Sequence, residues 1–141
     1  MNTDISTAAD TPLDGALRTL LDGDRVSADL RAGPLTYLDA TTADQVLAEA
    51  DAQRRSLLAA VDDVPDLDEL AYLIACRYVE FKAGWIQANT RIQYRSMMGA
   101  GPDRTLEASA ACVAHLLLLI EPLIDEAHLD RINGLLFTPL A

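Results

Sequence analysis

The feature that most constrains the fold is the stretch 67–98, whose apolar side chains recur with the period of an α-helix. At about 100° per residue they form two stripes on nearly opposite sides of a helix. The first stripe comprises Leu67, Leu70, Ile74, Phe81, Trp85, Ala88 and Ile92. The second comprises Cys76, Val79, Ala83, Ile86, Tyr94 and Met97. A helix that is apolar on two sides packs on two sides, so it lies either at the centre of a bundle or at an interface between subunits.

The length of this helix points to a second subunit. About 32 residues span roughly 48 Å at 1.5 Å per residue, whereas a compact chain of this size has a radius of gyration near 14 Å, roughly. The helix must therefore bend at Gly84, project beyond the domain, or be covered by another copy. We expect a homodimer whose interface contains Tyr94, Met97 and Met98, because aromatic residues and methionine are enriched at interfaces.

The rest of the chain also favours helices. Half of its 141 residues are apolar but only 5% are aromatic, whereas β-rich domains rely on aromatic and β-branched residues. We therefore expect an all-α fold, a single-domain helical bundle of about five helices over 11–141, organised around the long helix. The small, polar and acidic residues 1–10 predict a disordered tail. Periodicity and stop signals predict helices near 12–22, 43–62, 67–98, 104–120 and 122–133.

Local signals set the expected helix ends in the first third of the chain. Gly23 is expected to end the first helix. Thr42 and Gln45 have the spacing of a capping box and place the start of the next helix there. Residues 22–41 give mixed signals, compatible with one or two helical turns.

Charge and hydropathy exclude several classes of partner. The net charge of −11 argues against nucleic acid, whose phosphates require clustered cations, and against an anionic membrane surface. The longest apolar run, 110–120, is shorter than the roughly 20 residues of a membrane span, so we expect a core helix buried nearly all round. Cys76 and Cys112 are too few for a disulfide scaffold, and residues 1–10 do not resemble a secretory signal. The expected location is the cytoplasm.

A polar strip between the two apolar stripes of the long helix is the first candidate site. It comprises Arg77, Glu80, Gly84, Gln87, Arg91 and Arg95. Arg77 and Arg91 on either side of Gly84 leave a notch edged by guanidinium groups, which suits the carboxylate or phosphate of a small anionic ligand. Alternatively, these arginines pair with the acidic N-terminal helices, since residues 1–70 carry fifteen acidic residues and five arginines. The second interpretation is favoured because structural ion pairs also gather where charge is unevenly distributed.

Glu80 and His115 are candidates for catalytic proton transfer, because a buried glutamate beside a histidine can act as acid and base. Such a site would lie in a cavity between the 67–98 and 104–120 helices, lined by Trp85 and Tyr78. The spacing does not show that Glu80 and His115 meet, and an ion-paired Glu80 with a hydrogen-bonded core histidine is the favoured alternative. The ligand-binding residues of this site would be Arg77, Tyr78, Trp85, Gln87 and Arg91.

A metal site is the weakest candidate. Cys112 and His115 are three residues apart, and Cys76 and His128 could complete four ligands, but this spacing matches no zinc-finger pattern. Isolated cysteines in apolar runs are usually core residues. We expect no metal and no cofactor.

Two functions follow from these patterns. The first is a small acidic interaction or accessory protein that acts as a homodimer and meets a protein partner. The second is a small-molecule-binding protein or small enzyme of a specialised pathway, with the arginine strip orienting an anionic group and Glu80 or His115 transferring a proton.

Overall fold

The structure is a computed structural model that describes residues 13–63, 66–124, 127 and 130. It confirms the all-α class, since every regular element among these residues is helical. The predicted tail at 1–10 and most of the helix predicted at 122–133 lie outside the described residues. The elements are α2 (Leu13–Leu20), α3 (Gly23–Ala32), α4 (Ala40–Asp63), α5 (Leu67–Met97), α6 (Arg104–Ile120) and a 3₁₀ turn, η1 (Glu121–Leu123).

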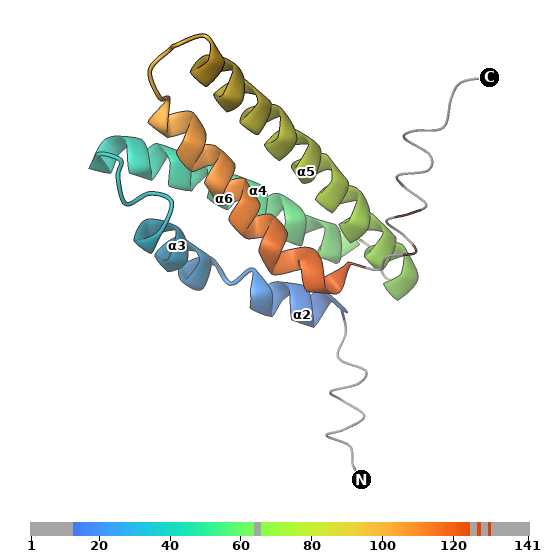
Figure 1. Cartoon of the computed structure of the whole chain (residues 1–141). Coiled ribbons are helices and arrows are strands. Elements are labelled where there is room, and N and C mark those ends of the chain that lie inside the picture. Colours follow the sequence, from blue (N-terminus) through green and yellow to red (C-terminus); the bar gives the residue numbers. More distant parts are fainter. Residues whose placement is uncertain (1–12, 64–65, 125–126, 128–129, 131–141) are drawn as a thin grey trace, which may run out of the picture.

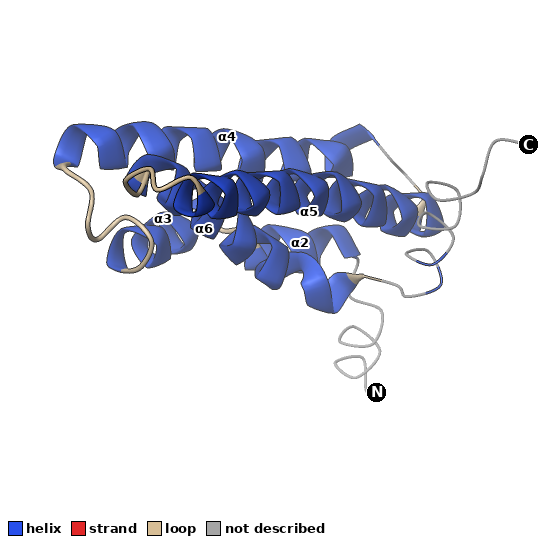
Figure 2. Cartoon of the chain, turned by 45° about the horizontal axis from the view of Figure 1, so that its top comes forward, coloured by secondary structure: helices blue, strands red, loops and turns tan. Residues whose placement is uncertain are grey.

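The helices form a layered bundle. In Figure 1, α6 runs along the front with α5 beside it on one side and α2 and α3 on the other. Figure 2 shows α4 above α5 and α6, with α2 and α3 below them. α6 packs against α5, α4 and α2, so each longer helix contributes to a shared interior.

The core is one cluster of mainly aliphatic side chains, as the composition predicts. Its largest fully buried members come from α2, α3, α4, α5 and α6 and from the residue after α2: Leu17, Leu21, Leu30, Leu57, Ile74, Leu116, Ile120 and Cys112. Removing this much apolar surface from water is the main stabilising term of such a bundle.

The expected end of the first helix at Gly23 is wrong. α2 ends at Leu20, and Gly23 opens a second helix, α3, whose N-cap Asp22 accepts a hydrogen bond from the backbone N–H of Arg25 at 3.3 Å. A Cβ added to Gly23 would lie only 3.0 Å from a guanidinium nitrogen of Arg54, so glycine fits a close approach between helices here. α3 persists because it buries Val26 and Leu30.

The expected start of the second long helix near Thr42 is also wrong. α4 begins at Ala40, and the preceding Asp39 carboxylate accepts hydrogen bonds at 2.9 Å from the backbone N–H and the hydroxyl of Thr42. Thr42 thus donates to the cap and is not the cap itself. These two hydrogen bonds lower the pKa of Asp39, and the one from the Thr42 backbone has the larger effect.

The two helices that carry most of the candidate residues were predicted closely. α5 ends one residue before the predicted end, and the predicted range 104–120 of α6 is confirmed. Asp66 caps α5 through the Asp68 N–H at 2.9 Å, and Asp103 caps α6 through the Leu106 N–H at 3.0 Å. α5 continues through Gly84 as one helix, and the chain turns at Gly99, whose φ is 73°.

α6 is less enclosed than its lack of charge predicts. It buries Ala108, Ala110, Cys112, Leu116, Leu117 and Ile120, but Leu118 is 67% exposed. By length and composition alone, Arg104–Leu123 could cross a membrane, a test that the core helices of water-soluble proteins also pass. In this structure 33% of that stretch is buried, and α6 packs against α5, α4 and α2.

Candidate functional site

The outer face of the C-terminal half of α5 is the most prominent open apolar surface in the described part of the chain. Ile86 is 50% exposed, Tyr94 61% and Met97 84%, and Met98 just after the helix is 66% exposed. These are four of the six exposed large hydrophobic residues among the described residues. The second apolar stripe predicted from the sequence is therefore left uncovered in this half of the helix.

The geometry of this face is that of a helix-packing seam. At about 100° per residue, one line of side chains falls within an arc of roughly 80°, almost opposite the core-facing Trp85 and Ile92. We call this line the α5 outer face; it comprises Ala83, Ile86, Thr90, Tyr94 and Met97. The spacing of three and four residues is the one that lets two helices interdigitate.

The residues of the predicted arginine strip differ in their contacts. Arg77 pairs with Glu80 on its own helix at 2.9 Å, and its buried Nε has no hydrogen-bond partner in the described part of the chain. Gln87 and Arg91 are exposed. The favoured interpretation, pairing with the acidic N-terminal helices, is not the arrangement seen for Arg77.

Two other arginines, which the sequence did not single out as connectors, join the N-terminal helices to α4. Arg31 of α3 pairs with Asp44 of α4 at 3.0 Å. Arg54 of α4 donates to the backbone carbonyl of Leu21 at 3.1 Å and pairs with Asp51 at 2.8 Å. The many acidic residues of 1–70 predict that some of them pair with arginines, but the sequence does not indicate which arginines these are.

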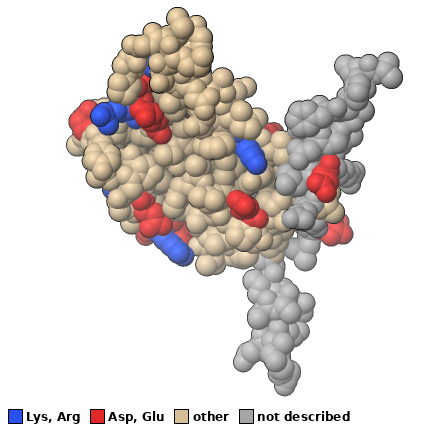
Figure 3. Space-filling view, in the orientation of Figure 1, with Lys and Arg blue, Asp and Glu red and all other residues tan. Residues whose placement is uncertain are grey.

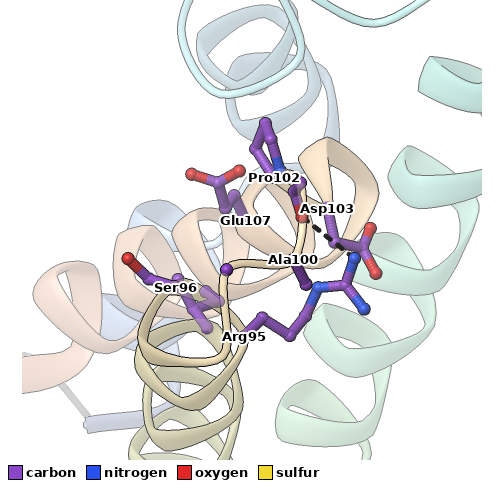
Figure 4. A pocket seen from close by; sticks show the side chains of 9 residues that line it. Arg95, Ser96, Ala100, Pro102, Asp103 and Glu107 are labelled. Carbon is purple, nitrogen blue, oxygen red and sulfur yellow. Dashed lines mark hydrogen bonds between the residues drawn. The ribbon is translucent and has the colours of Figure 1, made fainter.

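Arg95, at the far end of the strip, belongs to a hollow at the α5–α6 turn. Figure 4 shows this pocket with the Arg95 guanidinium turned toward the turn, where it donates to the Gly101 carbonyl at 3.0 Å. The hollow has a volume of about 320 Å³, and Asp103 and Glu107 also line it. The guanidinium is therefore already engaged in holding the turn.

A cleft between α4, α5 and α6 contains two of the predicted site residues. We call it the Trp85 cleft; its volume is about 220 Å³. Glu80 and Trp85 both line this cleft, in agreement with the cavity predicted between the two helices. Tyr78, which was also predicted to line it, is instead buried in the core, and the Lys82 ammonium lies 5.7 Å from the centre of its ring. The other lining residues are Glu49, Gln53, Phe81, Gly84, Ala88, Leu106, Ser109, Ala110 and Val113.

The structure does not bring Glu80 and His115 together. His115 is about 180° around α6 from Leu106, which faces the Trp85 cleft. Its Nε2 lies 3.8 Å from a carboxylate oxygen of Asp29 on α3 and has no hydrogen-bond partner among the described residues. The second ionisable residue of the cleft is Glu49 of α4, and sequence spacing could not show that it lies near Glu80.

Cys112 is an enclosed thiol. It is 1% exposed, and burial first, with the nearby Glu49 charge second, raises its pKa to about 11. Such a thiol stays protonated at neutral pH and is a poor nucleophile and metal ligand. Among the described residues no group of three or more His, Cys, Asp and Glu side chains is placed to hold a metal ion, and His128 lies outside them.

The chain shows no match to a protein-family model, to a curated protein or to a solved structure.

Proposed function

We propose that this chain is a non-enzymatic interaction protein that forms a homodimer through the α5 outer face. The observation that carries the proposal is the exposure of Ile86, Tyr94 and Met97 along one side of a single helix. A contiguous apolar surface of this kind on a small domain marks an interaction site, and aromatic residues and methionine are favoured there.

The distribution of charge supports a second copy as the occupant. Two chains of net charge −11 repel each other unless they meet where acidic residues are absent. The longest stretch of the sequence without Asp or Glu is 81–102, which contains the whole α5 outer face. The cations of this stretch, Lys82, Arg91 and Arg95, fall about 80° or more from the centre of the face, so they flank it.

The dimensions of α5 are compatible with such a dimer. Its 31 residues extend about 46 Å, and a stable interface buries about 800 Å² on each partner. Ala83 is exposed and its side chain is small, so two helix backbones can approach closely at this point of the face. A homodimer of this kind would work in the cytoplasm, away from membranes and nucleic acid, and present its acidic remainder to a protein partner.

A matched pair of substitutions tests the proposal. Ala83→Glu places a carboxylate on the α5 outer face, and Ala52→Glu makes the same change at an exposed position of α4. An unpaired carboxylate in an interface costs several kcal/mol, so Ala83→Glu should weaken dimerisation by about 100-fold or more. Ala52→Glu should leave it unchanged.

The readout is the molar mass from light scattering after size-exclusion chromatography, with circular dichroism to show that both variants fold. We expect a dimer for the unmodified chain and for Ala52→Glu, and a folded monomer for Ala83→Glu. A dimer that persists unchanged in the folded Ala83→Glu protein would show that the α5 outer face is not the interface.

A further inference from the structure

The Trp85 cleft lies on the opposite side of α5 from the proposed dimer interface, so it remains accessible in such a dimer. Its walls are apolar: Trp85 and Phe81 stand one helical turn apart on α5, and Leu106, Ala110 and Val113 face them from α6. Both aromatic side chains are only partly buried. An aromatic wall that the core leaves partly open is available to a ligand.

Gly84 widens this cleft. A Cβ added at this position would meet no atom within 4 Å, so packing does not require glycine here. Glycine in the middle of a helix costs about 1 kcal/mol relative to alanine. The missing side chain leaves open space beside Trp85, and that space is part of the cleft.

The charges that line the cleft are all of one sign. Among the described lining residues the ionisable side chains are Glu49 and Glu80, and no Lys, Arg or His is present. Glu80 is paired with Arg77 at 2.9 Å, whereas Glu49 has no ion pair in the described part of the chain. The field of the Glu49 carboxylate also reaches the buried Cys112 thiol and contributes to its raised pKa.

The geometry points to a small organic cation, an ammonium group on a short apolar body, as the ligand of the Trp85 cleft. The face of a tryptophan ring attracts cations, and quaternary ammonium groups are bound on aromatic walls in this way. Glu49 supplies the opposite charge, and the lining residues Gln53 and Ser109 have side chains that can form hydrogen bonds. An anionic ligand would meet two carboxylates. The volume of about 220 Å³ is below the roughly 300–1,000 Å³ of typical ligand pockets, so the ligand is small.

Trp85 is itself the reporter for the test, because it is the only tryptophan of the chain. Choline is the cationic probe, and 3,3-dimethyl-1-butanol, which has the same shape without the charge, is the neutral control. Both are titrated into the full chain at constant ionic strength while Trp85 fluorescence is recorded. We expect a saturable change with choline and an affinity lower by about five-fold or more for the neutral compound.

Variants locate the binding to this cleft. Glu49→Gln should weaken choline binding by about three-fold or more, whereas Glu107→Gln, an exposed α6 glutamate outside the cleft, should not change it. Gly84→Leu, which fills the open space and favours the helix, should abolish it. Ala83→Glu should still bind choline, so a failure of dimerisation and a failure of ligand binding are distinguishable.

Three results would overturn the inference. One is the absence of a saturable fluorescence change with choline. Another is equal affinity for choline and its neutral analogue, which would show a purely apolar cleft. The third is unchanged choline affinity in both Glu49→Gln and Gly84→Leu, which would place the binding elsewhere.

Discussion

At the scale of single residues, Arg54 illustrates how one side chain can join three helices. Its side chain is 13% exposed, and it donates to the carbonyl of Leu21 beyond the end of α2 while pairing with Asp51 on α4. It also lies against Gly23 at the start of α3. Its neighbour Arg55 pairs with the same Asp51, but its side chain is 67% exposed.

This contrast makes the two arginines a matched test. Arg54→Ala removes charge-assisted hydrogen bonds from a sheltered position and should lower the free energy of unfolding by about 2 kcal/mol. Arg55→Ala removes a solvent-exposed ion pair and should cost about 0.5 kcal/mol or less. Urea denaturation measures both values. Equal losses in the two variants would contradict the connecting role of Arg54.

Cys112 gives a pH-dependent prediction. Its pKa is raised from 9.0 to about 11 in the folded chain, so above pH 9 the unfolded chain loses this proton more readily than the folded one. The stability from the protonated thiol is fully present below pH 9 and is lost as the pH rises toward 11. The unfolding midpoint of the unmodified chain should therefore fall more steeply over this range than that of Cys112→Ala. Parallel pH profiles of the two proteins would disprove the shift.

At the scale of helices, the sequence predicted best where a strong cap and a clear break coincide. α5 and α6 each follow an aspartate cap, and Gly99 and Pro102 interrupt the chain between them. Their ends could be read from local chemistry because no distant contact was needed to define them.

The N-terminal helices could not be predicted in the same way. α3 buries Val26 and Leu30 in a core whose other members come from distant parts of the chain. The start of α4 at Ala40 depends on a choice between two caps, Asp39 and Thr42, that both have the right chemistry. Tertiary packing decides such cases, and a single sequence does not show it.

The cap of α6 is itself testable. Asp103 accepts the Leu106 N–H at 3.0 Å, so Asp103→Ala should lower the free energy of unfolding by about 1 kcal/mol. Asp103→Asn keeps a capping oxygen and should cost much less. Thermal or urea unfolding compares the two, and equal losses would show that the cap does not govern α6.

At the scale of the whole molecule, the two apolar stripes of α5 were visible in the sequence, but the Trp85 cleft was not. Periodicity identifies the sides of one helix, and it correctly indicated that Ile86 and Trp85 face different ways. It does not indicate which side chains of another helix lie opposite. The sequence therefore did not predict that Glu49 lines the cleft. Nor did it predict that His115 lies near Asp29 and not near Glu80.

The charge distribution also belongs to this scale. In the view of Figure 3, where α6 and α5 face the reader, charged side chains are few and most of the surface is uncharged. The α5 outer face lies in the stretch 81–102, which contains no Asp or Glu, and this favours the proposed self-association.

The most direct measurement is sedimentation equilibrium of the unmodified full chain over a wide range of micromolar concentrations. If the α5 outer face joins two copies, the mass at the higher concentrations will be twice the 15.2 kDa of one chain and will fall toward 15.2 kDa on dilution unless the dimer is very tight. A mass that stays at 15.2 kDa throughout would contradict the homodimer, and the exposed residues of α5 would then need another occupant.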